Sequence, residues 1–211
     1  MTSPTITRRL GNRQFIALVA AIMAMGALGI DLMLPVFDEI RAHFGLAEDA
    51  TDVAQIVTVY FLGMAVGQIF YGPFADRFGR KPVLYVGMAI YMLGAIGSAL
   101  APTLWVMLIS RFVWGLGAAG PRVVAVAVVR DVYEGKAMAR AMSFIMAVFI
   151  LIPIVAPSMG AAIAALGSWQ LVFWFAVLYT VVVGLWATRL PETLAAENRR
   201  ELHLQPMLDA G

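Results

Sequence analysis

The sequence contains no cysteine, only two histidines and few charged residues, and these shortages exclude several classes of function. Without cysteine there is no disulfide, no thiolate nucleophile and no cysteine-based metal site. Charged residues make up 13% of the 211-residue chain and hydrophobic residues 62%, whereas a soluble domain is about a quarter charged. Too little polar surface remains to cover a water-soluble globule, which excludes a soluble enzyme, a disordered tail and a nucleic-acid-binding protein. The composition indicates a membrane protein.

Long apolar runs fill most of the sequence. A membrane-spanning helix needs about 20 mainly apolar residues, and six runs of that length stand between polar breaks. The runs are continuous, whereas strands of a membrane barrel alternate in polarity over about 10 residues. We therefore expect an all-α membrane protein with six transmembrane helices. The predicted spans are Phe15–Pro35, Val53–Phe74, Val83–Ala101, Leu104–Val129, Met142–Ala164 and Trp169–Thr188.

The first apolar run follows three arginines, which also makes it a candidate secretory signal peptide. The apolar core of a signal peptide is about 7–15 residues long, and this run is longer. It also extends to Asp31 and Pro35. We therefore expect the first run to remain in the chain as a transmembrane helix.

Lysine and arginine are distributed unevenly between the two sets of connecting segments. Twelve of the fifteen lie before the first span, in the loops 75–82 and 130–141, or after residue 188. The opposite set holds only Arg41. Basic loops stay in the cytoplasm, so we expect both termini there. The predicted organisation is a cytoplasmic segment 1–14, a six-helix bundle 15–188 and a cytoplasmic tail 189–211.

Three ionisable residues, Asp31, Arg111 and Arg122, fall inside the predicted spans. Each costs at least a few kcal/mol in a bilayer and therefore usually faces a cavity or a partner. Asp31 and Arg111 are expected at similar depths, and Arg122 follows Arg111 by about three helical turns, which places both arginines on one side of their helix. We interpret Asp31 as a proton-binding site in a water-filled cavity; snorkelling of these side chains to the lipid headgroups is the alternative.

Small residues and prolines recur at helical spacing within several spans. In the fifth span, Pro153, Ala156, Pro157 and Gly160 form one small, kinked stripe. The second span contains Gly63 and Gly67 four residues apart, and the fourth contains Gly115, Gly117 and Gly120. Such stripes allow helices to approach closely. For the second span, ordinary bundle packing is the favoured interpretation.

The loop between the second and third spans has an unusual order of residues. It contains Gly72, Asp76, Arg77, Gly79, Arg80 and Lys81, followed by Pro82. We expect a tight turn in which Gly79 adopts a positive φ and Pro82 starts the next helix. A basic cytoplasmic loop would explain the charges but not their order. This order resembles the signature loop of the major facilitator superfamily.

Further segments resemble the same superfamily, over about residues 10–195. Within it, the chain is most similar to the bicyclomycin-resistance (Bcr/CflA-type) group of drug–proton antiporters. The segments are Asp31–Pro35, Arg111 with the small residues Gly115–Ala119, Arg130–Tyr133, Pro153–Gly160, Trp169 and Leu190–Leu194.

The resemblance implies roles for the residues singled out above. Asp31 and Arg111 would couple transport to protons. We also expect Arg122, Trp114 and Tyr60 to line the substrate cavity, although Trp114 and the Pro121–Arg122 pair are less usual for that group. The loop from Gly72 to Lys81 would act as a cytoplasmic gate, and the stripe in the fifth span would be the antiporter motif. The implied setting is the bacterial inner membrane, with no cofactor, metal or nucleic acid.

Members of the superfamily have two six-helix halves around a substrate path, and this chain resembles the N-terminal half. Six helices alone are expected to leave Asp31, Arg111 and Arg122 open to lipid, which is energetically poor. The leading hypothesis is a homodimer that exports small hydrophobic or cationic compounds in exchange for protons. Asp76 would then meet the second copy near Arg140 and Ser143. The alternatives are a separately encoded C-terminal half, or a non-transporting fragment or subunit that pairs with another membrane protein.

Overall fold

The computed structural model describes residues 10–47, 52–195 and 197, and all regular elements within these ranges are helical. The described part therefore confirms the predicted all-α class. Six segments are long and apolar enough to cross a membrane, as predicted. The elements are α1 (Asn12–Asp31), the 3-10 turn η1 (Leu34–Val36), α2 (Phe37–His43), α3 (Asp52–Phe78), α4 (Arg80–Ala99), α5 (Leu104–Val132), α6 (Gly135–Ala164) and α7 (Gln170–Ala187).

Several helices extend beyond the predicted spans. Helix α3 continues to Phe78 and α5 to Val132, while α6 already begins at Gly135. The apolar runs mark only the lengths that fit a hydrocarbon layer, whereas charged residues continue the same helices into the polar regions. The short helix α2 was not predicted, because its polar residues interrupt the apolar pattern.

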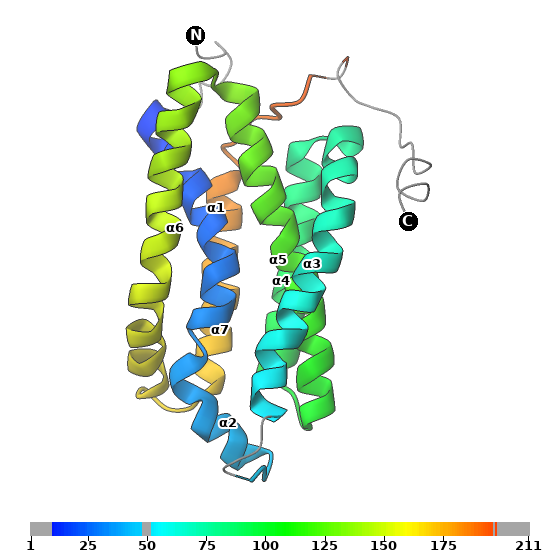
Figure 1. Ribbon diagram of the computed structural model, residues 1–211, viewed down its shortest axis with the longest axis vertical. Coiled ribbons are helices and arrows are strands. Elements are labelled where there is room, and N and C mark those ends of the chain that lie inside the picture. Colours follow the sequence, from blue (N-terminus) through cyan, green and yellow to red (C-terminus); the bar gives the residue numbers. More distant parts are fainter. Residues whose placement is uncertain (1–9, 48–51, 196, 198–211) are drawn as a thin grey trace.

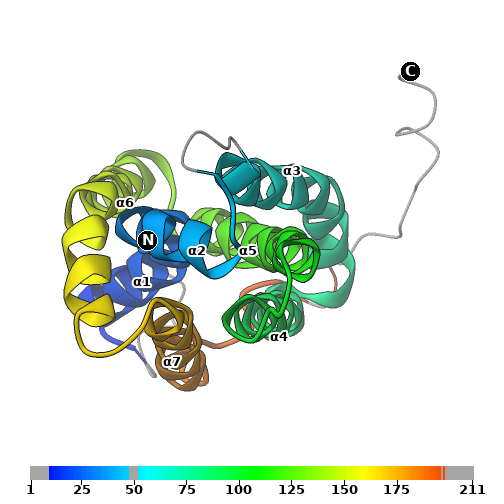
Figure 2. The same cartoon turned by 90° about the horizontal axis from the view of Figure 1, so that it is seen from below.

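The six long helices form two groups of three (Figure 1). Helix α5 packs against α3 and α4, and α1 packs against α6 and α7. Contacts between α1 and α5 and between α4 and α7 join the groups. Helices α3 and α6 stand apart along one side of the bundle (Figure 2). Because α1 belongs to the first three spans and α5 to the last three, the two halves of the sequence interleave.

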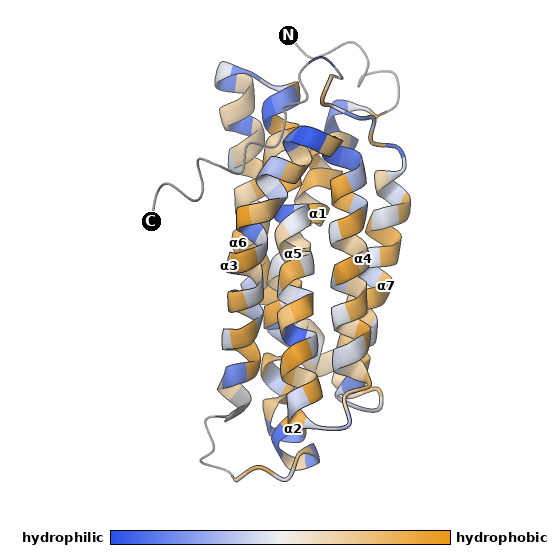
Figure 3. Cartoon of the chain, turned by 90° about the vertical axis from the view of Figure 1, so that its right-hand side faces the viewer, coloured by the Kyte–Doolittle hydropathy of each residue, from blue (hydrophilic) through white to orange (hydrophobic). Residues whose placement is uncertain are grey.

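The central position of α1 and α5 appears in their burial. Within the most apolar stretch of each helix, 72% of α1 and 61% of α5 is buried inside the bundle, compared with 17% of α6. Hydrophobic segments dominate the middle of the bundle, and hydrophilic segments gather at its two ends (Figure 3). One end, where α3 turns into α4 at Gly79, is called the Gly79 end below; α2 lies at the other (Figure 1).

Glycines bring the central helices into backbone contact. A Cβ atom on Gly63 would collide with the Phe112 carbonyl, and one on Gly115 would collide with the Tyr60 carbonyl. A Cβ on Gly67 would come within 2.8 Å of the Cβ of Ala119. The glycines of α3 and α5 therefore serve close helix packing, as favoured for the second span.

Candidate functional site

The site begins where α1 ends, at Asp31. Proline has no backbone N–H, so Pro35 is unable to donate the hydrogen bond that would continue the helix from the Asp31 carbonyl. The chain passes into the 3-10 turn η1 instead. The Asp31 side chain is left half-buried at this break and forms no ion pair with any described residue.

Arg111 lies in a sealed position between α1, α3 and α5. Its side chain is fully buried, Nη1 donates to the Gly29 carbonyl at 2.9 Å, and Nε donates to the Ile56 carbonyl at 3.3 Å. Gly29 is in the last turn of α1, where carbonyls lack helical partners and a cation is favoured by the helix dipole. Arg111 therefore caps α1, two residues before Asp31.

Two aromatic rings complete the enclosure of Arg111. The guanidinium carbon lies 4.6 Å from the ring centroid of Tyr60 and 4.7 Å from that of Trp114. Tyr60 donates its hydroxyl proton to the Gly26 carbonyl at 3.0 Å, which fixes the ring against α1. Such cation–π contacts contribute about 0.5–2 kcal/mol each. Carbonyls and rings thus hold this cation without a carboxylate among the described residues.

This arrangement bears on two expectations, of which the one for Arg111 was wrong. Arg111 was expected to face lipid in a single bundle, but it is 0% exposed because the closely packed backbones of α1, α3 and α5 surround it. Tyr60 and Trp114 were expected to line the substrate cavity, and both are buried within this bundle. Trp114 packs against the rings of Tyr91 and Phe173 as well as that of Tyr60, which makes it part of the core.

Arg122 lies on the same helix as Arg111 but is not sealed inside the bundle. Its side chain is half-buried, and its guanidinium carbon lies 5.6 Å from the ring centroid of Phe149 on α6. It borders a cavity of about 360 Å³ between α3 and α5, toward the Gly79 end. Arg111 contacts α3 and Arg122 shares its cavity with α3, so both arginines project from one side of α5, as their spacing predicts.

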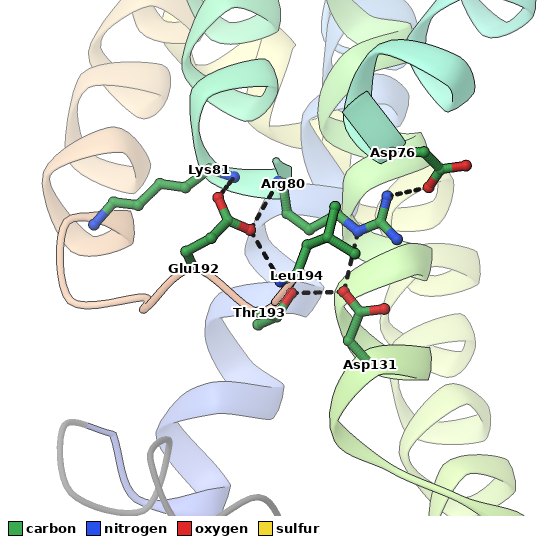
Figure 4. A network of polar contacts seen from close by, with 7 residues as sticks. All are labelled: Asp76, Arg80, Lys81, Asp131, Glu192, Thr193 and Leu194. Carbon is green, nitrogen blue, oxygen red and sulfur yellow. Dashed lines mark hydrogen bonds and ion pairs between the residues drawn. The ribbon is translucent and has the colours of Figure 1, made fainter. Parts of the chain in front are cut away.

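The turn at Gly79 has the predicted conformation, with a φ of 99°. The next helix begins directly afterwards at Arg80 rather than at Pro82, because Glu192 caps it. The Glu192 carboxylate accepts hydrogen bonds from the backbone N–H groups of Arg80 and Lys81 at 2.9 and 3.0 Å (Figure 4). Those N–H groups have no helical partners, and the positive end of the helix dipole attracts the carboxylate.

Arg80 joins the ends of three helices beside this cap. Its Nη1 lies 2.6 Å from the Asp76 carboxylate and its Nε 3.0 Å from that of Asp131 (Figure 4). Thr193 also donates to Asp131, at 2.7 Å. The segment after α7 is therefore tied to α4 and α5. The sequence interpretation missed the roles of Glu192 and Thr193, although both belong to a segment noted for its resemblance.

The remaining residues of the predicted gate loop have simpler surroundings. Arg77 is exposed, and its guanidinium carbon lies 5.4 Å from the Phe78 ring centroid. Lys81 donates from Nζ to the Thr188 carbonyl at 2.9 Å. Gly72 borders open space, since a Cβ atom there would meet nothing within 4 Å. Within the described residues, the Asp76 carboxylate is paired with Arg80 of its own chain.

The stripe in α6 docks that helix against the end of α1. A Cβ atom on Gly160 would collide with the Leu32 carbonyl, and Ala156 is fully buried. Pro157 is half-buried and Pro153 is exposed. The stripe therefore places α6 next to the helix break that carries Asp31. Because α6 begins at Gly135, Arg140 and Ser143 lie in its second and third turns rather than at its N-terminus. Their expected meeting with Asp76 of a second copy stays a prediction.

Comparison with known proteins identifies sequence relatives. The model of the Major Facilitator Superfamily matches residues 15–208. The chain is 34% identical over 195 residues to the bicyclomycin resistance protein homolog of Haemophilus influenzae, covering 90% of this chain and 48% of that protein. It is 33% identical over 194 residues to the multidrug resistance protein MdtL of Escherichia coli, covering 89% and 49%. The chain spans about half the length of the curated relatives it matches.

Solved structures show the same fold. The xylose transporter XylE of E. coli, in a partially occluded inward-open conformation, matches with a TM-score of 0.76 at 13% identity, covering 86% of this chain and 50% of that one. The human organic anion transporter MFSD10 matches with a TM-score of 0.70 at 20% identity, covering 95% and 53%. The relatives are transporters rather than enzymes. With its six-helix bundle and its signature turn at Gly79, the chain belongs to the Major Facilitator Superfamily and corresponds to the N-terminal half of that fold.

Proposed function

We propose that the chain is one half of a proton-coupled multidrug exporter in the bacterial inner membrane, completed by a second copy. The Gly79 end would face the cytoplasm, because most lysines and arginines lie in the segments at that end. The curated relatives are named for resistance to bicyclomycin or to several drugs, and the chain spans about half of their length. The finer assignment to proton exchange rests on the surroundings of Asp31.

The separation of Asp31 from Arg111 carries this proposal. The Nη1 and Nε atoms of Arg111 donate to backbone carbonyls and its guanidinium lies against two rings, whereas its buried Nη2 has no hydrogen-bond partner among the described residues. None of these nitrogens forms an ion pair with the Asp31 carboxylate. Asp31 is left half-buried without a described cationic partner. A carboxylate in this position exchanges a proton more readily than one locked in an ion pair, because protonation breaks no existing interaction. Arg122 and the Gly72–Lys81 turn would serve the cavity and its cytoplasmic gate.

Transport by the purified chain tests the proposal. In proteoliposomes, a panel of cationic, neutral and anionic aromatic compounds should drive proton movement, recorded with an entrapped pH-sensitive dye. Asp31→Asn should lower this flux at least about tenfold, because a proton-transferring group is lost. Glu39→Gln is the matched control, since it removes an exposed carboxylate from the α2 end. Equal flux in Asp31→Asn and wild type would refute proton coupling through Asp31.

The alternative of a non-transporting module that pairs with another membrane protein is favoured by one observation. Arg111 is sealed within a single bundle, so this charge does not require a second copy to cover it. Particle mass in lipid nanodiscs separates the two proposals, because one copy contributes 22.8 kDa. A particle with two copies supports the homodimer. A particle with one copy and no proton flux supports the module.

A further inference from the structure

The cavity beside Arg122 is open and has a polar wall. It measures about 360 Å³, within the range of about 300–1,000 Å³ usual for small-molecule sites. Helix α3 contributes Gln68 and Gly72, and a Cβ atom on Gly72 would meet nothing within 4 Å. Helix α5 contributes Arg122, Val126 and Arg130. The cavity thus combines an apolar wall with one side-chain amide and several guanidinium groups.

The charges around this cavity are unbalanced. Three arginines and one aspartate line it, and that aspartate, Asp76, is paired with Arg80. Asp131 pairs with the same arginine. Arg122 and Arg130, in contrast, form no ion pair with a described carboxylate. The cavity therefore carries an excess of positive charge, which disfavours a cationic occupant and favours an anionic one.

Arg122 is also held in place for recognition. Its stem is half-buried along α5, and its guanidinium lies over Phe149 at 5.6 Å from the ring centroid. This contact restricts the side chain without using its hydrogen-bond donors. A planar guanidinium matches the two oxygens of a carboxylate or phosphate, and partial burial strengthens the attraction because fewer water molecules screen it.

We propose that this cavity binds the anionic group of an amphiphilic compound, with Arg122 as the principal recognition residue and Arg130 as a second cation at its mouth. The apolar part of the compound packs against Val123 and Val126, which line the cavity. This inference rests on the proposed function and narrows its substrate class from hydrophobic or cationic compounds to hydrophobic compounds with a carboxylate or similar group. An anionic lipid headgroup offers the same chemistry.

Three probes of matched shape test the charge preference: 2-naphthoate, 2-naphthalenemethanol and 2-naphthylmethylammonium. Binding to the full chain in phosphatidylcholine nanodiscs is measured by equilibrium dialysis, with empty nanodiscs subtracted. Naphthoate should bind at least about tenfold more tightly than either other probe, as expected for a charge-assisted hydrogen bond in a half-buried site. Equal binding of the ammonium and carboxylate probes would overturn the proposal.

Variants connect this preference to Arg122. Arg122→Gln should weaken naphthoate binding at least about tenfold and leave binding of the neutral alcohol unchanged. Arg122→Lys keeps the charge but loses the planar fork, so an intermediate affinity is expected. Arg13→Gln is the control, because it removes one exposed arginine outside the cavity. Unchanged naphthoate binding in a folded Arg122→Gln protein would refute the assignment.

Lipid composition distinguishes the two sources of the anionic group. If a headgroup occupies the cavity, phosphatidylglycerol in the nanodiscs should weaken naphthoate binding to wild type but not to Arg122→Gln. Insensitivity to phosphatidylglycerol assigns the cavity to a soluble compound. The binding experiment and the transport experiment can fail independently. Asp31→Asn should still bind naphthoate. A chain that binds naphthoate but moves no protons contradicts proton-coupled export and leaves the anion site standing.

Discussion

Arg111 and Arg122 lie on the same helix and the same side of it, yet their surroundings are opposite. Arg111 is fully buried, donates hydrogen bonds to two backbone carbonyls and lies against two aromatic rings. Arg122 is half-buried, touches one ring and borders a cavity. The comparison shows that an arginine inside a membrane helix is not by itself a substrate-binding group. What distinguishes the two is whether the surrounding backbone already uses the guanidinium.

The largest effect is expected from removing the sealed cation. Arg111→Ala should destabilise the bundle by about 3 kcal/mol, because it leaves an internal void and an unpaired carbonyl at the end of α1. Thermal unfolding in detergent, followed by tryptophan fluorescence, measures the change. Arg122→Ala is the control and should unfold close to wild type. An equal loss of stability in both variants would show that the buried and the half-buried arginine contribute alike to the fold.

The second prediction concerns the close backbone contact between α3 and α5. Gly115→Ala should destabilise the bundle by about 1–3 kcal/mol, because the added Cβ atom forces α5 away from the Tyr60 carbonyl. Gly72→Ala adds the same atom where nothing lies within 4 Å. It should unfold at or slightly above the wild-type temperature, since alanine favours helix more than glycine does. A stable Gly115→Ala protein would show that the sealed region tolerates separation of its helices.

A third prediction extends the comparison to two carboxylates at the Gly79 end. Glu192→Ala should cost about 1 kcal/mol, because the first N–H groups of α4 lose their cap. Glu134 is the control: it stands at the N-cap position of α6 but makes no side-chain capping hydrogen bond. Glu134→Ala should therefore unfold like wild type. Similar losses in both variants would indicate that negative charge, rather than the capping geometry, stabilises this end.

The smallest effect sharpens the contrast between binding and stability. Arg122→Gln should lower the free energy of unfolding by no more than about 1 kcal/mol, because the only described contact that it removes is the cation–π contact with Phe149. Thermal unfolding of the protein used in the naphthoate experiments provides the measurement. A loss of several kcal/mol would identify Arg122 as a second structural arginine.

Much of the fold could be predicted from local sequence patterns. The number of spans follows from apolar run length, because a helix in hydrocarbon must satisfy its own backbone. The turn at Gly79 follows from the conformational freedom of glycine beside a charged break. The extra helical turns beyond Phe74 and before Met142 were missed because they lie in polar sequence, where hydropathy gives no signal.

The surroundings of the charged residues could not be predicted in the same way. The acceptors of Arg111 are backbone carbonyls of α1 and α3, and backbone atoms leave no mark in the residue pattern. Tyr60 and Trp114 resembled cavity residues because an aromatic ring suits either a binding site or a core. The Glu192 cap joins residues more than a hundred positions apart, so only the folded arrangement reveals it.

The interleaving of the helices has a consequence for how the protein is made. Helix α1 leaves the ribosome before the other helices of this bundle, but it packs against α6, α5 and α7, which come later in the chain. Its apolar surface is stable in contact with lipid while the intervening segments are synthesised. Within this bundle, α1 is therefore made before the helices that it packs against, and it gains its full set of neighbours only after α7 has been synthesised.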